Sequence, residues 1–383
     1  MRSRHDVVII GGGPAGSACA VQLARAGLDV LLADRFSSRH QIGDALPPRA
    51  SRILRQLGVL EAFLQAGHIP SFGNTSAWGS TALRSTDFIL APHGHGWHTD
   101  RATFDAMLRQ AASETGARLC TQCRSIEWGN APEGCWRICI EETDGSVYDC
   151  DTRWLVDATG RSAAVARSEG ARRIVHDTLT GFTAFLREHD WSNDRDSLST
   201  IEAVSSGWWY TARLPQRMRM VTYYTDAREP TSTAARTLPG LQSLLASAPH
   251  ISPRLAGYSF MKAPVVMAAN SSRLERPWGE GWIAVGDAAA SHDPLSSMGI
   301  SAALNSGMEA ATALLRHFAG DAGAIIRYGS DITAAFEAYR HACARVYAEE
   351  HRWTDSQFWA TRVSSLEGGF SPTIHNPVIS SLR

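Results

Sequence analysis

Lysine is almost absent from this chain of 383 residues. Lys262 is the only lysine among 37 lysine and arginine residues, which excludes lysine nucleophiles and Schiff bases nearly everywhere. The chain also lacks an apolar run long enough to span a bilayer. It enters a strand-like segment directly, without the pattern of a signal peptide. We therefore expect a reduced, cytoplasmic protein with no membrane span.

An excess of charge of either sign is missing too. The 37 basic residues are balanced by 38 acidic ones, so the net charge of −1 gives no electrostatic basis for binding nucleic acid. With 44% hydrophobic and 20% charged residues, the composition is that of an ordinary globular protein. The length exceeds that of one simple core, and we expect two interleaved domains.

The seven cysteines do not form a repeated metal-binding pattern. Cys120 and Cys123 make a C-x-x-C, but no second C-x-x-C and no paired histidines accompany it. We interpret these residues as buried free cysteines in a β-meander, with a zinc or redox role as the alternative. No metal site is predicted.

The most informative segment spans residues 6–34. An apolar run, Val7–Ile10, enters the hexapeptide GGGPAG at residues 11–16, which is a G-x-G-x-x-G. A stretch with helical periodicity follows, and a second apolar run ends at Asp34. A strand, a glycine turn, a helix and an acid after the next strand form the context of a dinucleotide-binding βαβ unit. A βαβ unit without a ligand is the alternative.

Each residue of this turn has a physical task. Gly11 permits a tight turn, Gly13 lets a pyrophosphate approach the backbone, and Gly16 lets the helix pack on the strand. The first N–H groups of the helix face the phosphates, and Asp34 accepts hydrogen bonds from a ribose. The predicted cofactor contacts in this segment are Gly11, Gly13, Ala15, Gly16, Asp34 and Arg35.

A second nucleotide contact is predicted at residues 281–300. A strand ends at Asp287, and a new helix starts at Gly299 after a loop. Asp287 is expected to bond a ribityl hydroxyl. The N–H groups of Met298, Gly299 and Ile300 are expected to face the part of a flavin that becomes negative on reduction. A plain strand–loop–helix crossover is the alternative.

Together these residues resemble the FAD-dependent monooxygenases and their relatives, the flavin-dependent tryptophan halogenases, over most of the chain. The motifs are GGGPAG at 11–16 with Asp34, IGDALPP at 42–48, DRATFDAML at 100–108, VDATGRS at 156–162 and GDAAASHDPLSSMG at 286–299. The resemblance implies an extended FAD with its flavin ring over the DPLSSMG loop. It also implies that Arg101 contacts the diphosphate or ribityl chain and that Gly160 passes close to the adenine side.

Two departures argue against halogenation. Halogenases of this type carry a lysine where this chain reads SAWGS at 76–80, and a glutamate where it has Ser296. The segments SAWGS, GWWYTARLP at 207–215 and HRWTDSQFW at 351–359 are more similar to another branch. That branch hydroxylates a peptidyl tryptophan during tryptophylquinone biogenesis.

The predicted fold class is α/β: a Rossmann-like, discontinuous FAD-binding domain with an inserted antiparallel-sheet substrate domain and a helical C-terminal part. Periodicity changes along the chain set the boundaries. The FAD-binding segments are residues 1–71, 97–176 and 276–320, the substrate-sheet segments are 72–96 and 177–275, and the C-terminal helical region is 321–383.

The resemblance implies oxygen chemistry. Reduced flavin and O2 give a C4a-hydroperoxide, whose distal oxygen attacks an electron-rich aromatic carbon if water is excluded. The expected substrate is an indole or another electron-rich aromatic, including a tryptophan side chain within a polypeptide. Because no second G-x-G-x-x-G exists, NAD(P)H binds transiently or a partner flavin reductase supplies the electrons.

Four residues are candidates for chemistry beyond cofactor binding. His292, beside the loop under the flavin, is the candidate base, and a solvent-facing or core histidine is the alternative. Trp78, Trp208 and Tyr210 are candidate aromatic walls, because strand alternation puts Trp208 and Tyr210 on one face. Core packing is the alternative for all three.

Three other functions stay open. One is a flavin-dependent reductase or dehydrogenase on the same fold that acts on a lipid-like olefin, and a second is a flavin-dependent halogenase. The third is a non-enzymatic flavin-holding partner of another protein's maturation, although an intact DPLSSMG loop has little use without redox work.

Overall fold

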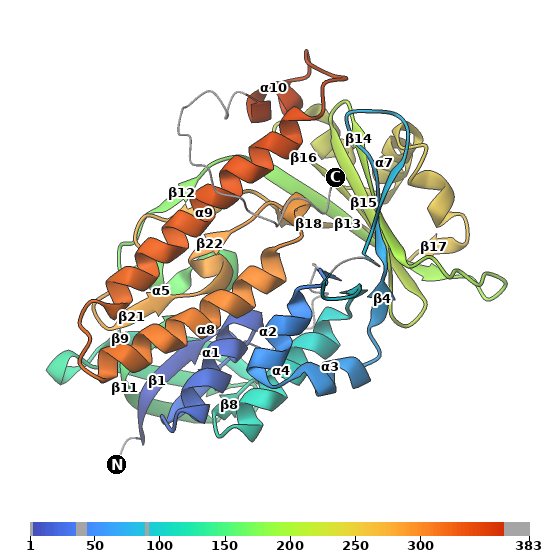
Figure 1. The fold of residues 1–383 in the computed structure, drawn as a ribbon. Coiled ribbons are helices and arrows are strands. Elements are labelled where there is room, and N and C mark those ends of the chain that lie inside the picture. The colour runs from blue at the N-terminus through green and yellow to red at the C-terminus, as the bar shows by residue number, and fades with distance from the viewer. Residues whose placement is uncertain (1–2, 36–43, 89–91, 364–383) are drawn as a thin grey trace.

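The computed structural model describes residues 3–35, 44–88 and 92–363. Figure 1 shows two lobes, each built on a large sheet, with a long C-terminal helix running along both. None of the helices in these ranges combines the length and the apolar character needed to cross a membrane.

A mostly parallel sheet forms the nucleotide-binding lobe. Its strands are, in spatial order, β20 (Trp278–Gly279), β21 (Trp282–Ala284), β11 (Val147–Asp157), β1 (Ser3–Ile10), β2 (Val30–Ala33) and β8 (Arg118–Cys120). Ile10 pairs with Ala33 on one side and with Asp157 on the other. The carboxyl ends of three strands therefore meet at one edge, where ligands of open α/β sheets bind.

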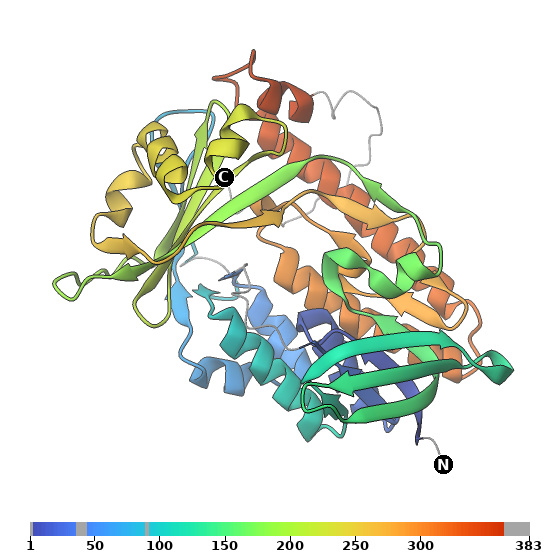
Figure 2. The ribbon, with the colours of Figure 1, turned by 180° about the vertical axis from the view of Figure 1, so that it is seen from behind.

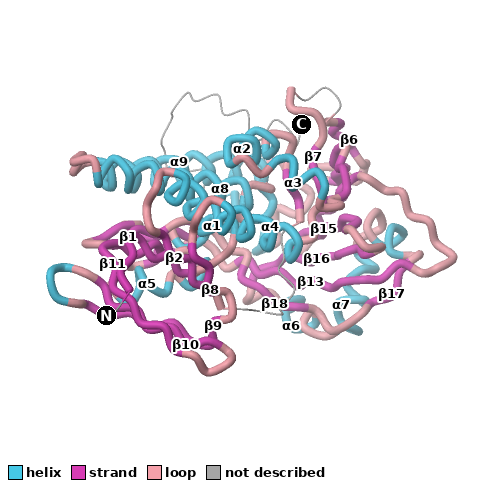
Figure 3. The backbone as a smooth tube through the Cα atoms, turned by 90° about the horizontal axis from the view of Figure 1, so that it is seen from below, coloured by secondary structure: helices cyan, strands magenta, loops and turns pink. Residues whose placement is uncertain are grey.

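Different layers cover the two faces of this sheet. Val7 and Ile9 face a helical layer, whereas Val8 and Ile10 face an antiparallel meander, so β1 is apolar on both sides. The helical layer, seen beside the strands in Figure 3, contains α1 (Pro14–Arg25), α2 (Ala50–Leu57), α3 (Leu60–Gln65), α4 (Arg101–Glu114) and α8 (Gly299–Phe318). The other layer, in front in Figure 2, contains α5 (Ala164–Ser168) and the strands β9 (Cys123–Asn130) and β10 (Trp136–Glu142). These two strands continue the same sheet, because β10 pairs with β11 and β9 pairs with β10.

A second large sheet forms the other lobe. Its strands are β17 (Tyr258–Phe260), β13 (Leu179–Glu188), β16 (Met218–Asp226), β15 (Gly207–Leu214), β14 (Leu198–Val204), β5 (Gly73–Ala77) and β6 (Arg84–Asp87), with β18 (Val265–Ala268) also on β13. All pairs are antiparallel except β14 with β5, because β5 arrives from a distant part of the chain. One face packs on α6 (Pro230–Ala234) and α7 (Leu238–Leu244). The other packs on α9 (Ala324–Ala348) and α10 (Gln357–Val363).

Two small sheets lie where the chain passes between the lobes. One contains β12 (Arg173–Val175), β19 (Ser272–Leu274) and β22 (Ala290–Ser291), and the other contains β3 (Ala45–Leu46), β7 (Gly96–His98) and β4 (Ile69–Ser71). The predicted fold class is confirmed: a discontinuous Rossmann-like domain, an inserted sheet domain and a helical C-terminal part. The residue boundaries between these domains stay predictions.

Candidate functional site

The glycine turn after β1 combines tight packing with one open position. A Cβ on Gly11, whose φ is +112°, would lie 2.2 Å from the carbonyl oxygen of Ala158, and a Cβ on Gly16 would lie 2.0 Å from that of Gly11. Both glycines are therefore required by the packing of the protein itself. A Cβ on Gly13 would meet no atom within 4 Å, and Gly13 is the N-cap of α1. The turn thus presents open space at a helix N-terminus, as a phosphate site requires.

Asp34 follows β2 beside this turn. Its Oδ2 lies 3.7 Å from Nη1 of Arg109, which also donates to the carbonyl oxygen of Gly12. Burial raises the pKa of Asp34, and a hydrogen bond with the Gly12 backbone and the Arg109 charge oppose that rise. Sequence reasoning missed Arg109, which α4 supplies from a distant part of the chain. Arg35, the next predicted contact, is exposed.

The start of α4 is fixed by two polar contacts. Asp100 accepts a hydrogen bond from the N–H of Thr103 at 2.7 Å, as an N-cap does. Arg101 pairs through two of its nitrogens with Asp105, at 3.1 and 3.2 Å. This fork holds the mostly buried guanidinium in one orientation.

The VDATGRS turn is held by Asp157. Its carboxylate accepts hydrogen bonds from the N–H and hydroxyl of Thr159 and from the N–H of Ala166. These contacts place Gly160 at a φ of +68°, where a Cβ would meet no atom within 4 Å. The backbone there is open to a ligand, as the predicted contact requires.

The two nucleotide motifs meet in space. A Cβ on Gly286, whose φ is +57°, would lie 2.7 Å from the Cβ of Ala15, so the turn before Asp287 packs directly on α1. Asp287 is 37% exposed and lies 3.5 Å from Nε of Arg161. The N-terminus of α8 follows the loop, where Met298 offers no side-chain cap and a Cβ on Gly299 would meet nothing within 4 Å. Uncapped N–H groups beside open space fit a ligand atom that becomes negative.

A pocket lies between the 295–298 loop and the second sheet, with about 720 Å³ of space when the part open to solvent is included. Loop residues Leu295 to Met298 form one wall. Asn74, Trp97, His98, Ser199, Cys343 and Val346 are among the residues of the other walls. The pocket therefore joins the loop after the second nucleotide motif to polar groups of the sheet.

His98 is the most buried polar side chain of this pocket, at 1% exposure. The backbone of Arg213 contacts the ring of His98, although this contact falls outside ordinary hydrogen-bond geometry. Burial, with the nearby Arg219 charge, lowers the pKa of His98 to about 4. It is therefore a neutral imidazole at pH 7 with capacity to bond a ligand. No pattern in the sequence distinguished His98 from other histidines.

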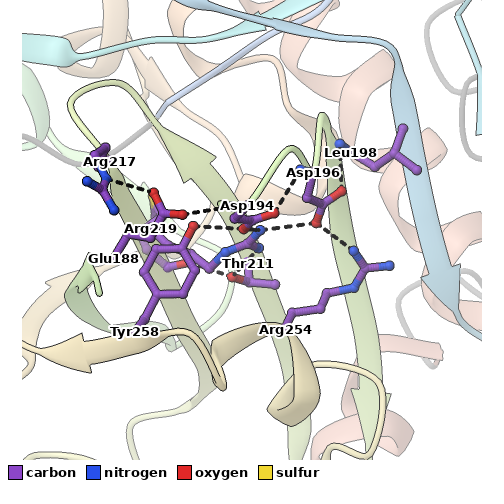
Figure 4. Close-up of polar contacts among 10 residues, drawn as sticks. Glu188, Asp194, Asp196, Leu198, Thr211, Arg217, Arg219, Arg254 and Tyr258 are labelled. Atoms are coloured by element: carbon purple, nitrogen blue, oxygen red, sulfur yellow. Dashed lines mark hydrogen bonds and ion pairs between the residues drawn. The ribbon is translucent and has the colours of Figure 1, made fainter. Parts of the chain in front are cut away.

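A polar network around Arg219, whose charge acts on His98, supports the second sheet. Figure 4 shows this network. The side chain of Arg219, which is 1% exposed, contacts Asp194 at 2.7 Å and Asp196 at 3.1 Å. Arg254 also pairs with Asp196, and the hydroxyl of Tyr258 donates to Asp194. This network fixes the segment that leads into β14.

A buried carboxylate lies beside the pocket, next to the lining residue Ala45. Asp44, 5% exposed, accepts a hydrogen bond from the hydroxyl of Tyr210 at 2.9 Å. Burial raises the pKa of Asp44 to about 6. Asp44 belongs to the IGDALPP motif, whose first residues, Ile42 and Gly43, lie outside the described residues. Sequence reasoning did not pair it with Tyr210.

Comparison with known proteins assigns the family. Residues 4–346 match the family described as "FAD binding domain", which is most of the chain. The protein belongs to this FAD-binding family. The residues at both nucleotide motifs fit that cofactor, and the protein is an FAD-dependent oxidoreductase.

Relatives include enzymes of more than one activity. The FAD-dependent oxidoreductase LodB of Marinomonas mediterranea, a name given as putative, is 29% identical over 94% of this chain and 96% of its own. The 1H-pyrrole-2-carbonyl-[peptidyl-carrier protein] brominase of Pseudoalteromonas luteoviolacea is 27% identical over 88% and 81%. These relatives support the predicted resemblance to halogenase-like flavoproteins.

Solved structures share the fold. The myxobacterial chondrochloren halogenase CndH superposes with a TM-score of 0.81 at 24% identity, covering 99% of this chain and 93% of that one. The peptidyl tryptophan dihydroxylase QhpG superposes with a TM-score of 0.70 at 22% identity, covering 94% and 79%. These structures show that the chain has the fold of halogenase-like flavoproteins, as the sequence predicted.

In this flavoprotein two of the three candidate aromatic walls, Trp78 and Trp208, contact α9. Trp208 stacks on Tyr224 at 4.0 Å between ring centroids and donates its indole N–H to the hydroxyl of Tyr347. Trp78 donates to the carbonyl oxygen of Val346. Trp208 and Tyr210 share the face toward the loop, as alternation predicted, whereas Trp209 packs on the opposite face. A role for Trp78, Trp208 and Tyr210 in substrate contact stays a prediction.

His292 packs beside the flavin-side loop. Its ring lies 4.5 Å from that of Tyr339, and burial lowers the pKa of His292 to about 4. A histidine with that pKa is a weak proton acceptor at pH 7. Its role as a base stays a prediction.

Asp293 anchors the same loop. Its carboxylate accepts hydrogen bonds from the N–H of Leu295 and from the hydroxyl of Tyr347, at 2.9 and 2.8 Å. Burial raises the pKa of Asp293 to about 7. A buried carboxyl therefore fixes the start of the loop that leads into α8.

The structure also shows where the residues relevant to halogenation and to metal binding lie. Ser296 lines the pocket, whereas Lys262 is exposed just before β18. Cys120 and Cys123 are free thiols with their sulfur atoms 3.4 Å apart, and both are buried. Within the described ranges, no group of three potential metal ligands comes together.

Proposed function

We propose that this FAD-dependent oxidoreductase is a monooxygenase that hydroxylates an electron-rich aromatic ring, with a tryptophan side chain in a polypeptide as the favoured substrate. The pocket between the 295–298 loop and the second sheet carries the proposal. It places apolar Leu295 and Trp97 near the neutral ring of His98, which suits a ring with one N–H or O–H group.

The residues of the chain bind and orient, while the cofactor supplies the redox chemistry. Bound FAD provides the electrons that activate O2. The glycine turn and Asp34 would hold its adenosine diphosphate part, Arg101 would hold the diphosphate or ribityl chain, and the helix start at Gly299 would bind the part of the ring that becomes negative on reduction. Apolar pocket residues exclude water, which would divert the oxidant, and His98 orients the substrate ring.

Two relatives support a polypeptide-borne substrate. QhpG is named as a peptidyl tryptophan dihydroxylase, and the brominase is named for a pyrrole group on a peptidyl-carrier protein. Both names describe an aromatic ring attached to a polypeptide. Among the described residues the pocket is partly open to solvent, which suits such a substrate better than a closed cavity.

Halogenation is the second candidate, because several relatives are named as halogenases. The pocket argues against it: Ser296 stands where halogenases carry a glutamate, and the single lysine is elsewhere on the surface. A halide oxidised at the flavin would find no lysine to direct it.

An isotope experiment separates the candidates. The holoprotein, reduced photochemically, is mixed with a tryptophan-containing peptide, bromide and ¹⁸O2. Incorporation of ¹⁸O into the peptide supports the proposal, and a brominated peptide supports halogenation. Turnover of an olefin without oxygen supports a reductase or dehydrogenase instead. Bleaching of the flavin by NADH or NADPH, compared with bleaching by an added flavin reductase, identifies the electron donor.

A further inference from the structure

The C-x-x-C turn lies directly beside Asp34 in the nucleotide-binding lobe. Cys120 is the last residue of β8, and Cys123 is the first residue of β9. The carbonyl oxygen of Cys120 accepts a hydrogen bond from the N–H of Asp34 at 2.8 Å, and the N–H of Cys123 donates to the carbonyl oxygen of Asp34 at 3.3 Å. Both ends of the turn therefore hold the backbone of the acid that is predicted to bind the adenosine ribose.

The two thiols of this turn lie close enough to react with each other. Their sulfur atoms are 3.4 Å apart. The thiol of Cys120 donates to Oε1 of Glu142 at 3.0 Å, and the thiol of Cys123 donates to the carbonyl oxygen of Cys120 at 3.0 Å. Because a disulfide bond is about 2.05 Å long, a movement of roughly 1.4 Å would close it. Within the part of the chain that the structure describes, no third metal ligand joins the pair.

We propose that Cys120 and Cys123 are a reversible oxidation site, at which hydrogen peroxide converts the two thiols into a disulfide that weakens the binding of FAD. A C-x-x-C next to a βαβ unit is typical of redox-active pairs in reduced proteins. A flavoprotein itself supplies peroxide, because reduced flavin that meets O2 without a substrate releases it. The effect on FAD rests on the predicted contact between Asp34 and the adenosine ribose, and the identity of the substrate does not enter.

The oxidation balances with two electrons and two molecules of water. Cys120 reacts first, since Glu142 accepts its proton. Its sulfur attacks one oxygen of the peroxide, the O–O bond breaks, and a sulfenic acid and one water form. The sulfur of Cys123 then displaces hydroxide from that sulfenic acid, and the thiol proton of Cys123 converts the hydroxide into the second water. Two electrons thus pass from the two sulfur atoms to the peroxide, and a thiol reductant reverses the reaction.

Closing the disulfide disturbs the contacts of Asp34. The reaction removes both thiol protons, so the hydrogen bonds to Glu142 and to the carbonyl oxygen of Cys120 are lost. The new bond also draws together the two residues whose backbones hold Asp34 from both sides. A carboxylate displaced in this way makes longer and less linear hydrogen bonds to a ribose, and such bonds are weaker. The disulfide form should therefore bind FAD less tightly than the dithiol form.

The surroundings of the pair make its reaction slow at pH 7. Cys120 is 5% exposed and Cys123 is 3% exposed, which favours a small oxidant such as peroxide. Burial raises the pKa of both thiols, and the charge of Glu142 adds to the rise, as the charge of Asp34 does at Cys123. Since the thiolate is the nucleophile, the rate of disulfide formation should rise about tenfold per pH unit between pH 7 and pH 9.

The first experiment detects the disulfide in the wild-type holoprotein. Trypsin cleaves after Arg118 and Arg124, so one peptide, residues 119–124, contains both cysteines. After treatment with hydrogen peroxide and alkylation, mass spectrometry should show this peptide two hydrogens lighter and without alkyl groups. Dithiothreitol should restore the dithiol form. In Cys123→Ser, Cys120 should instead stop at a sulfenic acid, which dimedone traps.

Cys139 is the internal control for this experiment. It is a partly exposed thiol that lies opposite Asp149 in the sheet, a carboxylate rather than a second thiol. Peroxide should oxidise it to a sulfenic acid that dimedone traps, without a disulfide. Complete oxidation of Cys139 while the 119–124 peptide stays in its dithiol form would overturn the proposal. A sulfinic acid at Cys120 in place of the disulfide would overturn it as well.

The second experiment measures the link to FAD. The dissociation constant of FAD, obtained from its release on serial dilution of the holoprotein, should be at least about fivefold higher in the disulfide form. Thermodynamic linkage requires the reverse effect: saturating FAD should raise the reduction potential of the pair by about 20 mV, which is the fivefold change converted for a two-electron couple. In Cys120→Ser, which forms no such disulfide, peroxide should leave the dissociation constant unchanged.

These measurements separate the oxidation site from the proposed function. A disulfide that changes neither the dissociation constant of FAD nor the reduction potential would overturn the link to Asp34. Weaker FAD binding in the disulfide form supports the link whether the enzyme hydroxylates, halogenates or reduces its substrate. Because wild-type protein provides both measurements, the test does not depend on the folding of any variant.

Discussion

At the scale of single residues, the glycines of the first turn divide into two kinds. Gly11 and Gly16 touch the backbone of the protein so closely that any side chain would clash, whereas Gly13 faces open space. All three stand in the same motif, and the sequence assigned them different tasks on the basis of how such turns bind dinucleotides. The contacts of Gly11 and Gly16 agree with the tasks of turning and packing. The task of Gly13 toward a pyrophosphate stays a prediction.

This difference makes a matched pair of variants informative. Gly13→Val should fold normally and lose FAD, because its side chain would occupy the space of the pyrophosphate. Gly16→Val should lower the free energy of unfolding by several kcal/mol, because its Cβ would lie 2.0 Å from a backbone oxygen. Flavin absorbance after gel filtration and thermal melts measure the two effects. A yellow, fully loaded Gly13→Val protein would contradict the assignment.

Asp293 should make stability depend on pH. Its folded pKa of about 7 lies above the unfolded value of 3.8, so its contribution is fully present below pH 4 and is lost as pH rises toward 7. Asp293→Asn keeps an acceptor for the Leu295 N–H and removes the titration. The unfolding free energy of the variant, relative to the wild type, should therefore rise by up to about 4 kcal/mol between pH 4 and pH 7. Chemical denaturation at several pH values measures this, and parallel curves would refute it.

At the scale of elements, β15 has two different faces. Trp208 and Tyr210 point to the flavin-side loop and α9, whereas Trp209 points to α7 and its neighbours. Period-two alternation predicted this division without knowledge of the partners. It could not predict that Trp208 stacks on Tyr224, because that contact depends on the register with β16.

The Arg219 network should contribute more to the free energy of unfolding than an exposed ion pair does. Arg219→Ala leaves Asp194 and Asp196 without their buried partner and should cost about 2–4 kcal/mol of unfolding free energy, less than a fully buried pair because both carboxylates are partly exposed. Arg124→Ala is the control: this arginine is 71% exposed and its partner Glu141 is 36% exposed, so its loss should cost less than about 1 kcal/mol. Urea titrations compare the two, and equal losses would show that burial does not decide the effect.

At the scale of the whole molecule, the two nucleotide motifs and the sheet classes were predictable, since glycine spacing and hydrophobic period are local signals. The pocket was not. Asp44 and Tyr210 are 166 positions apart, and Arg109 reaches Gly12 from 97 positions away. Such contacts exist only after segments that are distant in the sequence have packed together, and no local pattern encodes them. The burial that lowers the pKa of His98 is likewise a property of the assembled fold.

Because segments from both ends of the chain meet at the cofactor site, FAD should stabilise the entire molecule. At a free FAD concentration 100 times its dissociation constant, the gain is about 2.7 kcal/mol. The holoprotein should therefore melt several degrees above the apoprotein in a single transition. Calorimetry tests this, and a melting temperature independent of FAD would contradict the placement of the site.

The helix α9 has a mechanical consequence. Its 25 residues make a rod about 37 Å long. Near one end, the hydroxyl of Tyr328 donates a hydrogen bond to the backbone of β21, and further along Tyr339 hydrogen-bonds Ser271. At the far end, the hydroxyl of Tyr347 accepts a hydrogen bond from the indole N–H of Trp208. Because these hydrogen bonds hold α9 at three points along its length, the helix fixes the separation of the two lobes. A hinge motion of the two lobes would require those hydrogen bonds to break. Entry of substrate into the enzyme therefore depends on movements of short loops rather than of whole lobes.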